Sequence, residues 1–169
     1  MNIKFLASYI IENYGAVRGK KAFQKIFYFL TEAQIPTGLN YTLYHYGPYS
    51  SELDYRTDQI QLAGAIEMVP KGKGYEIRSG SKTSVLSKDS SLDENKQDID
   101  KILSKLPLDN PMKLELYSTT HYAAKVRKEI YDCINPEDIV EEVVRIKKDK
   151  FSKDEIREAY QFIAHELFV

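Results

Sequence analysis

One stretch, residues 41–64, constrains the fold of this chain more than any other. It opens with Y-T-L-Y-H-Y, a run of β-forming residues that predicts a short strand. Gly47 and Pro48 follow and break the strand, and Pro48 suits the first turn of a helix. A serine after the proline can cap that helix, and Gly64 ends it. The stretch therefore predicts a strand, a rigid corner and a helix in immediate succession.

The segments around this stretch complete a recognisable order of elements. Apolar residues recur at helical spacing in residues 2–15 and 19–34, which precede the strand. After the helix, residues 66–77 alternate apolar and polar side chains on either side of a K-G-K-G turn, which predicts a β-hairpin. Helix, helix, strand, helix and hairpin is the order of a winged helix-turn-helix, with the hairpin as its wing.

The second half of the chain is predicted to be helical throughout. Residues 81–90 are polar and rich in serine, so we expect a connector there. Signals for the start of a helix then recur: Asn110-Pro111, Asn135-Pro136, and Ser152 with Glu155. We predict an α+β, mainly helical fold in which a winged-helix-like half, residues 1–80, packs on a helical half, residues 91–169, as one compact unit.

Composition places the chain among ordinary folded proteins. Hydrophobic residues make up 43% of its 169 residues and charged residues 29%, and the formal net charge of −1 creates no global attraction for nucleic acid or anionic lipid. The chain has one cysteine, Cys133, and so cannot form an internal disulfide. No segment has the length and hydrophobicity of a signal peptide or a membrane span. We expect a cytoplasmic protein with no membrane association.

The residues that could carry chemistry are scattered rather than clustered. His45, His121, His165 and Cys133 form no pair at metal-ligand spacing, and no phosphate-binding glycine loop is present. Hydroxyl groups precede His121 in S-T-T-H, but we favour a buried histidine bonded to a hydroxyl over a catalytic one. The sequence thus predicts no enzyme activity, no metal and no cofactor.

The aromatic residues around the corner suggest a protein-binding surface. The chain holds 13 tyrosines, and Tyr44, Tyr46 and Tyr49 flank the rigid Gly47-Pro48 turn. Tyrosine combines apolar area with a polar tip, which suits binding surfaces, and a rigid turn lowers the entropy lost on binding. In the alternative reading, these tyrosines only wedge the following helix onto the core.

The second helix carries further polar residues near the corner in sequence. Its apolar stripe leaves Gln24 and Tyr28 to one side, which would place them at the surface. Lysines gather at its start, and we expect them to form a solvated face: Lys20, Lys21 and Lys25, with Arg18 just before.

DNA binding is the alternative function that a winged helix suggests. The helix after the corner is the one that would enter the major groove, yet it carries Glu52, Asp54 and Asp58 against a single Arg56. Such a surface opposes phosphate contacts. The hairpin is basic, and its candidate nucleic-acid residues are Lys71, Lys73 and Arg78. We therefore place DNA binding second to protein binding.

Three motifs in order resemble a known family. K-A-F-Q-K-I-F-Y-F-L, Y-G-P-Y-S at 46–50 and L-E-L-Y-S-T-T-H-Y at 114–122 are similar in order and spacing to the YwgA-like family of uncharacterised bacterial proteins. More distantly, they resemble the Panacea domain of SocA-like antitoxins. After His121, Tyr122-Ala123-Ala124 stands where that domain has a Pro-Trp-like element, which favours the YwgA-like family.

The resemblance implies a protein that binds another protein and is not an enzyme. Panacea domains neutralise toxins, and SocA acts as a protease adaptor, so a toxin or a protease-type partner is implied; the tyrosine-rich surface would also permit a homodimer. The counterparts of the shared motifs, together with Tyr44 and Arg56, form the predicted partner-binding set: Gln24, Lys25, Tyr28, Tyr44, Tyr46, Gly47, Pro48, Tyr49, Ser50, Arg56 and His121.

Overall fold

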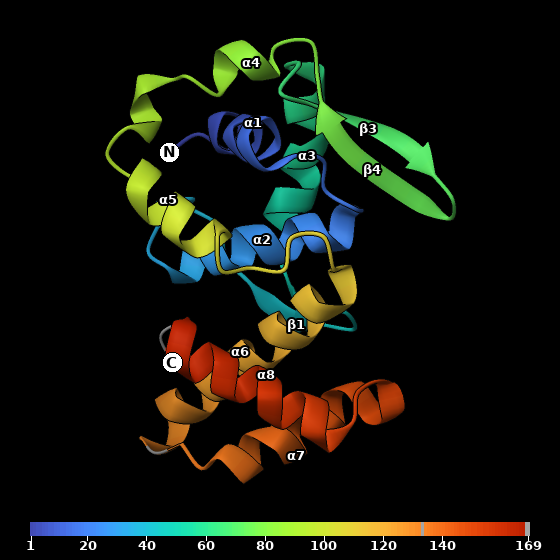
Figure 1. Cartoon of the computed structure of the whole chain (residues 1–169), viewed down its shortest axis with the longest axis vertical. Coiled ribbons are helices and arrows are strands. Elements are labelled where there is room, and N and C mark those ends of the chain that lie inside the picture. Colours follow the sequence, from blue (N-terminus) through green and yellow to red (C-terminus); the bar gives the residue numbers. More distant parts are fainter. Residues whose placement is uncertain (133, 168–169) are drawn as a thin grey trace.

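The computed structural model describes residues 1–132 and 134–167, and it confirms an α+β, mainly helical fold (Figure 1). The α-helices are α1 (Ile3–Tyr14), α2 (Lys20–Glu32), α3 (Ser51–Leu62), α4 (Thr83–Leu86), α5 (Lys96–Leu103), α6 (Pro111–Tyr131), α7 (Pro136–Lys147) and α8 (Lys153–Glu166), with 3-10 turns η1 (Ser90–Leu92) and η2 (Lys148–Lys150). The strands are β1 (Thr42–Tyr44), β2 (Gly47–Tyr49), β3 (Ile66–Lys71) and β4 (Gly74–Ser79). They pair as two antiparallel hairpins, β1–β2 and β3–β4. None of the helices described is both long and apolar enough to cross a bilayer.

Most predicted helix starts are confirmed by their caps. The Asn2 side chain accepts a hydrogen bond from the Lys4 amide at the start of α1. The side chains of Asn110 and Asn135 cap α6 and α7 in the same way. Ser152 and Glu155 form a capping box at the start of α8. These local signals are reliable because each satisfies backbone amides that the helix itself leaves unpaired.

The corner is built differently from the single strand that the sequence predicts. Gly47–Tyr49 is itself a strand, β2, which folds back on β1 so that Thr42 pairs with Tyr49 and Tyr44 with Gly47. His45 lies in the turn between them. A proline is tolerated here because a two-stranded sheet leaves one edge of each strand without ladder partners. Ser50 then caps α3, and its Oγ accepts a hydrogen bond from the Leu53 amide.

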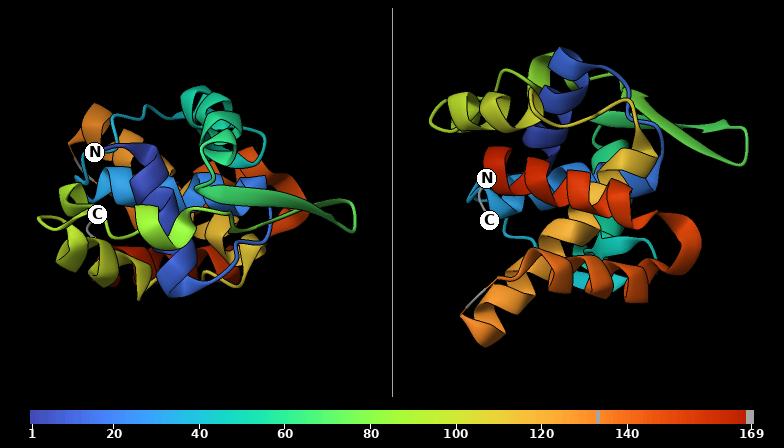
Figure 2. Two further views of the ribbon diagram at one scale, coloured as in Figure 1. Left: turned by 90° about the horizontal axis from the view of Figure 1, so that it is seen from above. Right: turned by 60° about the horizontal axis from the view of Figure 1, so that its bottom comes forward.

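The predicted β3–β4 hairpin is confirmed, but the predicted connector is more structured than expected. Strands β3 and β4 project from the body of the molecule (Figures 1 and 2). Residues 81–90 hold the short helix α4 and the start of η1 rather than only an irregular connector. Thr83 anchors α4, because its buried Oγ1 donates a hydrogen bond to the Ala65 carbonyl at 2.7 Å. Helix α5 begins at Lys96.

Helix α2 lies at the centre of the molecule. Helix α1 and α5 lie on one side of it, and α6 and the β1–β2 hairpin lie on the other (Figure 1). Its predicted stripe is buried, but Gln24 and Tyr28 are only 4% and 0% exposed, so the prediction that they lie at the surface is wrong. The physical reason is that α2 is covered on both sides and buries nearly its whole circumference. Buried residues from both predicted halves form one continuous hydrophobic core.

Candidate partner-binding site

The three motifs that are far apart in sequence meet at the corner. The Gln24 side chain on α2 makes two hydrogen bonds with Ser50, donating to its carbonyl and accepting from its amide, each at 2.9 Å. One residue further, the Lys25 Nζ donates to the Pro48 carbonyl at 2.6 Å. We call these two side chains, with their backbone partners at Pro48 and Ser50, the latch. The latch binds β2 and the start of α3 to α2.

Helix α6 closes the corner from the opposite side. Gly47 has a φ of +92°, and a Cβ added to it would lie 2.6 Å from the Oγ1 of Thr119, so only glycine fits. Nearby, the Tyr28 hydroxyl is hydrogen bonded to His121 Nδ1 at 2.8 Å. Burial lowers the pKa of His121 to about 4, so this histidine is neutral at pH 7. Its position agrees with a buried histidine bonded to a hydroxyl.

Burial divides the predicted partner-binding residues into two groups. Those on the inside hold the corner in place and contribute little to the outer surface: Gln24, Lys25, Tyr28, Gly47, Pro48, Ser50 and His121. The expectation of a solvated lysine face also fails for Lys25, which is 2% exposed. Tyr44 and Tyr46 are exposed, at 60% and 47%, and Tyr49 is half-buried.

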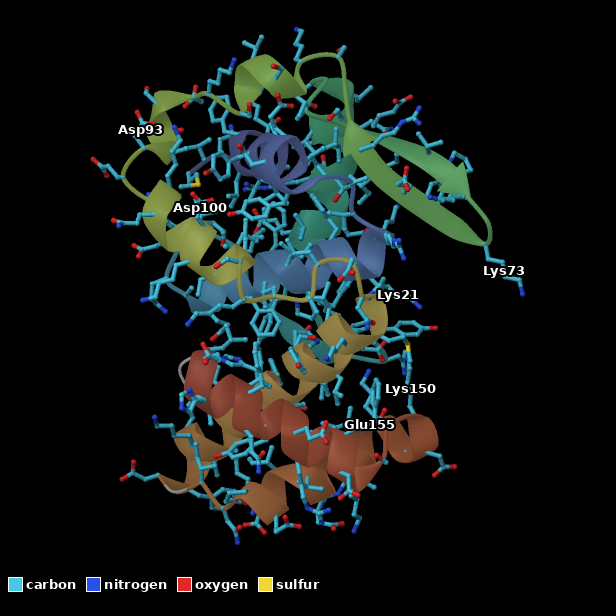
Figure 3. The ribbon with its side chains drawn as sticks, in the orientation of Figure 1. Lys21, Lys73, Asp93, Asp100, Lys150 and Glu155 are labelled. Carbon is cyan, nitrogen blue, oxygen red and sulfur yellow. The ribbon has the colours of Figure 1, made fainter. Side chains whose placement is uncertain are left out.

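The exposed tyrosines are supported by neighbouring rings and cations. The rings of Tyr44 and Tyr49 lie 5.2 Å apart between centroids, and burial together with the nearby Asp54 carboxylate raises the pKa of Tyr49. The Lys21 Nζ lies 3.0 Å from the centroid of the Tyr46 ring, and that of Lys150 lies 5.5 Å from it. Figure 3 shows these two lysines on the same side of the molecule. These contacts restrict the aromatic rings before any partner binds.

A cavity of about 360 Å³ opens beside these tyrosines, between the first turns of α2 and the β1–β2 hairpin. It is lined by Lys20, Lys21, Gln24, Lys25, Tyr44, Tyr46, Gly47, Tyr49 and Asp54. We call it the corner pocket. The lining thus combines the exposed rings with the two side chains of the latch, Gln24 and Lys25, and two further lysines.

The ammonium group of Lys25 is electrostatically unusual. Burial, together with the positive charges of Lys147 and Lys21, lowers the pKa of Lys25 to about 7, whereas Glu115 acts in the opposite direction. Its hydrogen bond to the Pro48 carbonyl stabilises the amine, but a neutral carbonyl does not neutralise a charge.

A buried ion cluster that the sequence analysis missed anchors the turn of the hairpin. Glu115 on α6 accepts hydrogen bonds from Lys147 at 2.6 Å and from Lys150 at 2.8 Å. Lys147 also donates to the His45 carbonyl at 3.0 Å, so it joins α7 to the turn. Burial alone would raise the pKa of Glu115, but the hydrogen bonds from the two lysines lower it below its usual value. The sequence feature that could have revealed this cluster is Glu115, which stands between two leucines in L-E-L. All residues from 114 to 121 are buried.

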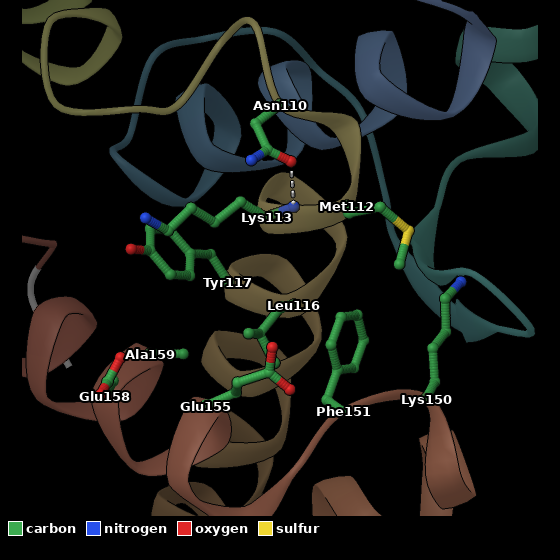
Figure 4. Close-up of a pocket in the computed structure, with 10 residues that line it drawn as sticks. All are labelled: Asn110, Met112, Lys113, Leu116, Tyr117, Lys150, Phe151, Glu155, Glu158 and Ala159. Carbon is green, nitrogen blue, oxygen red and sulfur yellow. Dashed lines mark hydrogen bonds between the residues drawn. The ribbon is translucent and has the colours of Figure 1, made fainter.

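A second cavity lies behind Lys150 and belongs to the helical half. It measures about 350 Å³ and is lined by residues of α6 and α8, including Leu116, Tyr117 and Ala159 (Figure 4). Its charges are mixed, since Lys113 and Lys150 face Glu155 and Glu158 across it. It therefore shows no single charge preference.

The residues of the predicted nucleic-acid site are mostly paired within the protein. Lys71 forms an ion pair with Glu76 at 2.7 Å, and Arg78 pairs with Glu67 at 3.1 Å. Lys73 is exposed at the turn between β3 and β4 (Figure 3). On α3, Arg56 pairs with Glu52 and lies outside the latch.

Metal ligands do not gather anywhere in residues 1–132 and 134–167, where no three His, Cys, Asp or Glu side chains lie close enough to hold an ion. Cys133, which the sequence analysis assigned to no site, lies outside the described residues. The three histidines are far from forming a shared site: His121 is buried in α6, His45 lies in the hairpin turn and His165 lies near the end of α8.

Comparison with known proteins supports the predicted resemblance. No model of a protein family matches the chain. The chain is 28% identical to "Uncharacterized protein YwgA" of Bacillus subtilis (strain 168) over 161 residues, which are 91% of this chain and 90% of that protein. The alignment includes almost the whole of both chains, so the similarity to YwgA extends well beyond the three motifs.

Proposed function

We propose that this protein is a non-enzymatic interaction module that binds a partner protein through the exposed tyrosines of the corner. The observation that carries the proposal is the division at the corner between a buried latch and exposed rings. Gln24 and Lys25 are fixed inside by hydrogen bonds, whereas Tyr44 and Tyr46 project into solvent. Polar residues in a core are expensive to bury, so a latch of this kind is expected where a surface must keep one shape.

Rigid tyrosines are effective anchors for binding. A tyrosine side chain has two rotatable bonds, and rings that are already restrained lose little conformational entropy when a partner covers them. Tyr46 is restrained by Lys21, and Tyr44 packs against Tyr49. Binding hot spots are enriched in tyrosine for these reasons.

The biological setting that we propose is antitoxin-like or adaptor-like, in the cytoplasm. It is supported by the order of the three motifs, which is similar to that of the Panacea domain, and by their meeting at one place in the fold. On this proposal, the partner is a toxin or a protease-type protein. A homodimer through the same surface is the alternative that the tyrosines also permit.

The proposal is tested by affinity capture from the native host, followed by mass spectrometry. The wild-type chain should retain one stoichiometric partner protein, and the Tyr44→Ala, Tyr46→Ala double variant should lose it while its melting temperature stays within a few degrees. The matched control is Leu62→Ala with Val85→Ala, because these side chains are also exposed and apolar, at 89% and 75%, but lie on α3 and α4 away from the tyrosines. Retention of the partner by the tyrosine variant would contradict the proposal.

A winged-helix DNA-binding regulator remains the second candidate. The order of α1, α2, α3 and the projecting β3–β4 hairpin favours it (Figure 1). The charges oppose it, because two of the three basic hairpin residues are paired with Glu67 and Glu76. Recovery of nucleic acid without a specific protein, in the same capture experiment, is the outcome that would favour this candidate.

A further inference from the structure

We infer that the corner pocket receives an aspartate or glutamate side chain from the partner protein, and that Lys21 and Lys25 recognise its carboxylate. This inference rests on the proposed function and specifies the chemistry of the partner. The partner segment that it requires is short, with one acidic residue next to apolar residues that cover Tyr44 and Tyr46.

The first support is a group of lysines that form no direct ion pair within the described part of the protein. Three lysines line the pocket, and within the described part of the chain none of Lys20, Lys21 and Lys25 forms an ion pair with a carboxylate. The carboxylate nearest to this cluster on α6 is Glu115, which is already bonded to Lys147 and Lys150. A buried ammonium without a counterion is unfavourable, so a carboxylate supplied by a ligand would relieve that cost.

The second support is the shape and lining of the cavity. Its volume of about 360 Å³ accommodates a side chain or two, but not a folded element. The rings of Tyr44, Tyr46 and Tyr49 supply the apolar part of the lining, and Lys21 lies against the Tyr46 ring. An acidic residue flanked by apolar residues matches both surfaces at once.

One carboxylate in the pocket limits the charge of the ligand. Asp54 shares the lining, and burial together with its carboxylate raises the pKa of Tyr49. A second negative charge on the ligand would lie close to the Asp54 carboxylate. A singly charged carboxylate is therefore accommodated with less repulsion than a doubly charged phosphate.

Proton uptake gives the inference a distinctive signature. The charged groups that act on Lys25 are Lys21 on its own helix, Glu115 on α6 and Lys147 on α7. Because the pKa of Lys25 is about 7 in the free protein, much of the amine is neutral at pH 8. A bound carboxylate favours the charged form, so binding at pH 8 should take up a proton.

The experiment uses a library of random dodecapeptides displayed on phage, selected against the full-length protein. We expect the selected peptides to share one aspartate or glutamate next to an apolar residue. Calorimetry then compares a selected peptide with its Gln or Asn counterpart on the wild-type protein. The neutral peptide should bind at least tenfold more weakly, and the acidic peptide should take up protons at pH 8 when buffers of different ionisation enthalpy are compared.

Variants of the protein test which lysines are responsible. Lys21→Met and Lys25→Met should each lower the affinity for the acidic peptide at least tenfold and have little effect on the affinity for the neutral one. The matched control is Lys101→Met, because Lys101 is exposed on α5, outside the pocket, and its removal should leave affinity unchanged. Circular dichroism establishes that each variant is folded; if Lys25→Met is not, Lys21→Met and the neutral peptide still decide the result.

Three results would overturn the inference. The first is a selection that yields no peptides, or only peptides without an acidic position; the second is acidic peptides whose affinity is the same on both lysine variants. The third is binding of inorganic phosphate with no acidic peptide selected, which would make the pocket a small-anion site. None of these bears on the proposed function, which the capture experiment with the Tyr44→Ala, Tyr46→Ala variant judges separately.

Discussion

Gln24 holds the shape of the corner through the backbone of a single residue. Its amide group satisfies both the N–H and the C=O of Ser50, which also caps α3. All of these groups are buried, so water cannot replace the side chain if it is removed. The residue thus links the core of the protein to the position of the tyrosines.

Replacing Gln24 by alanine should lower the free energy of unfolding by about 3 kcal/mol, because two buried backbone groups would each lose their partner. Urea unfolding followed by circular dichroism measures this change. Gln59→Ala is the matched control, since Gln59 is exposed on α3 and its loss should change stability by less than about 0.5 kcal/mol. Equal effects of the two substitutions would mean that the latch does not stabilise the corner.

The sequence singled out these residues but placed two of them wrongly. Tyrosines around a Gly-Pro pair are visible as a local pattern, and two of the three are exposed as a binding surface requires. Gln24 and Lys25 were placed at the surface because their partners lie 26 and 23 residues away in sequence. Periodicity describes one face of a helix, and it carries no information on a second element that covers the other face.

Helix α6 connects the corner to the helical half of the molecule. The Oγ1 of Thr119 fills the space that a Cβ on Gly47 would need. His121 is hydrogen bonded to Tyr28, and Glu115 accepts hydrogen bonds from Lys147 and Lys150. The start of this helix at Asn110-Pro111 was predicted from sequence. Its ion cluster was not, because the pairing joins residues that are 32 and 35 positions apart.

Replacing Glu115 by glutamine should destabilise the protein by about 3–5 kcal/mol, since Lys147 would remain buried without its countercharge. The control is Glu141→Gln, which removes an ion pair with Lys153 whose two side chains are about half exposed; its loss should cost no more than about 1 kcal/mol. Thermal or urea unfolding of both variants measures the difference. A small effect of Glu115→Gln would show that the cluster does not hold α7 to the hairpin.

At the scale of the whole molecule, α2 organises the fold. It is buried between α1 and α5 on one side and α6 with β1–β2 on the other, so both halves share one core (Figure 1). The sequence predicted the mainly helical α+β fold class, because the helices and the β3–β4 hairpin carry local signals. It did not predict the β1–β2 hairpin, since a three-residue strand that contains Gly47 and Pro48 has no alternating pattern to detect. The order of elements is compatible with a winged helix, and that assignment remains a proposal.

The central claim, that a partner covers the exposed side of the corner, is tested most directly by amide hydrogen exchange. The measurement compares the protein alone with the protein bound to its captured partner, by mass spectrometry of peptic fragments. We predict slower exchange in residues 41–50 on binding, where the chain around Tyr44 and Tyr46 is exposed, and no change in α4 and α5. Protection confined to the β3–β4 hairpin, with residues 41–50 unchanged, would contradict the claim.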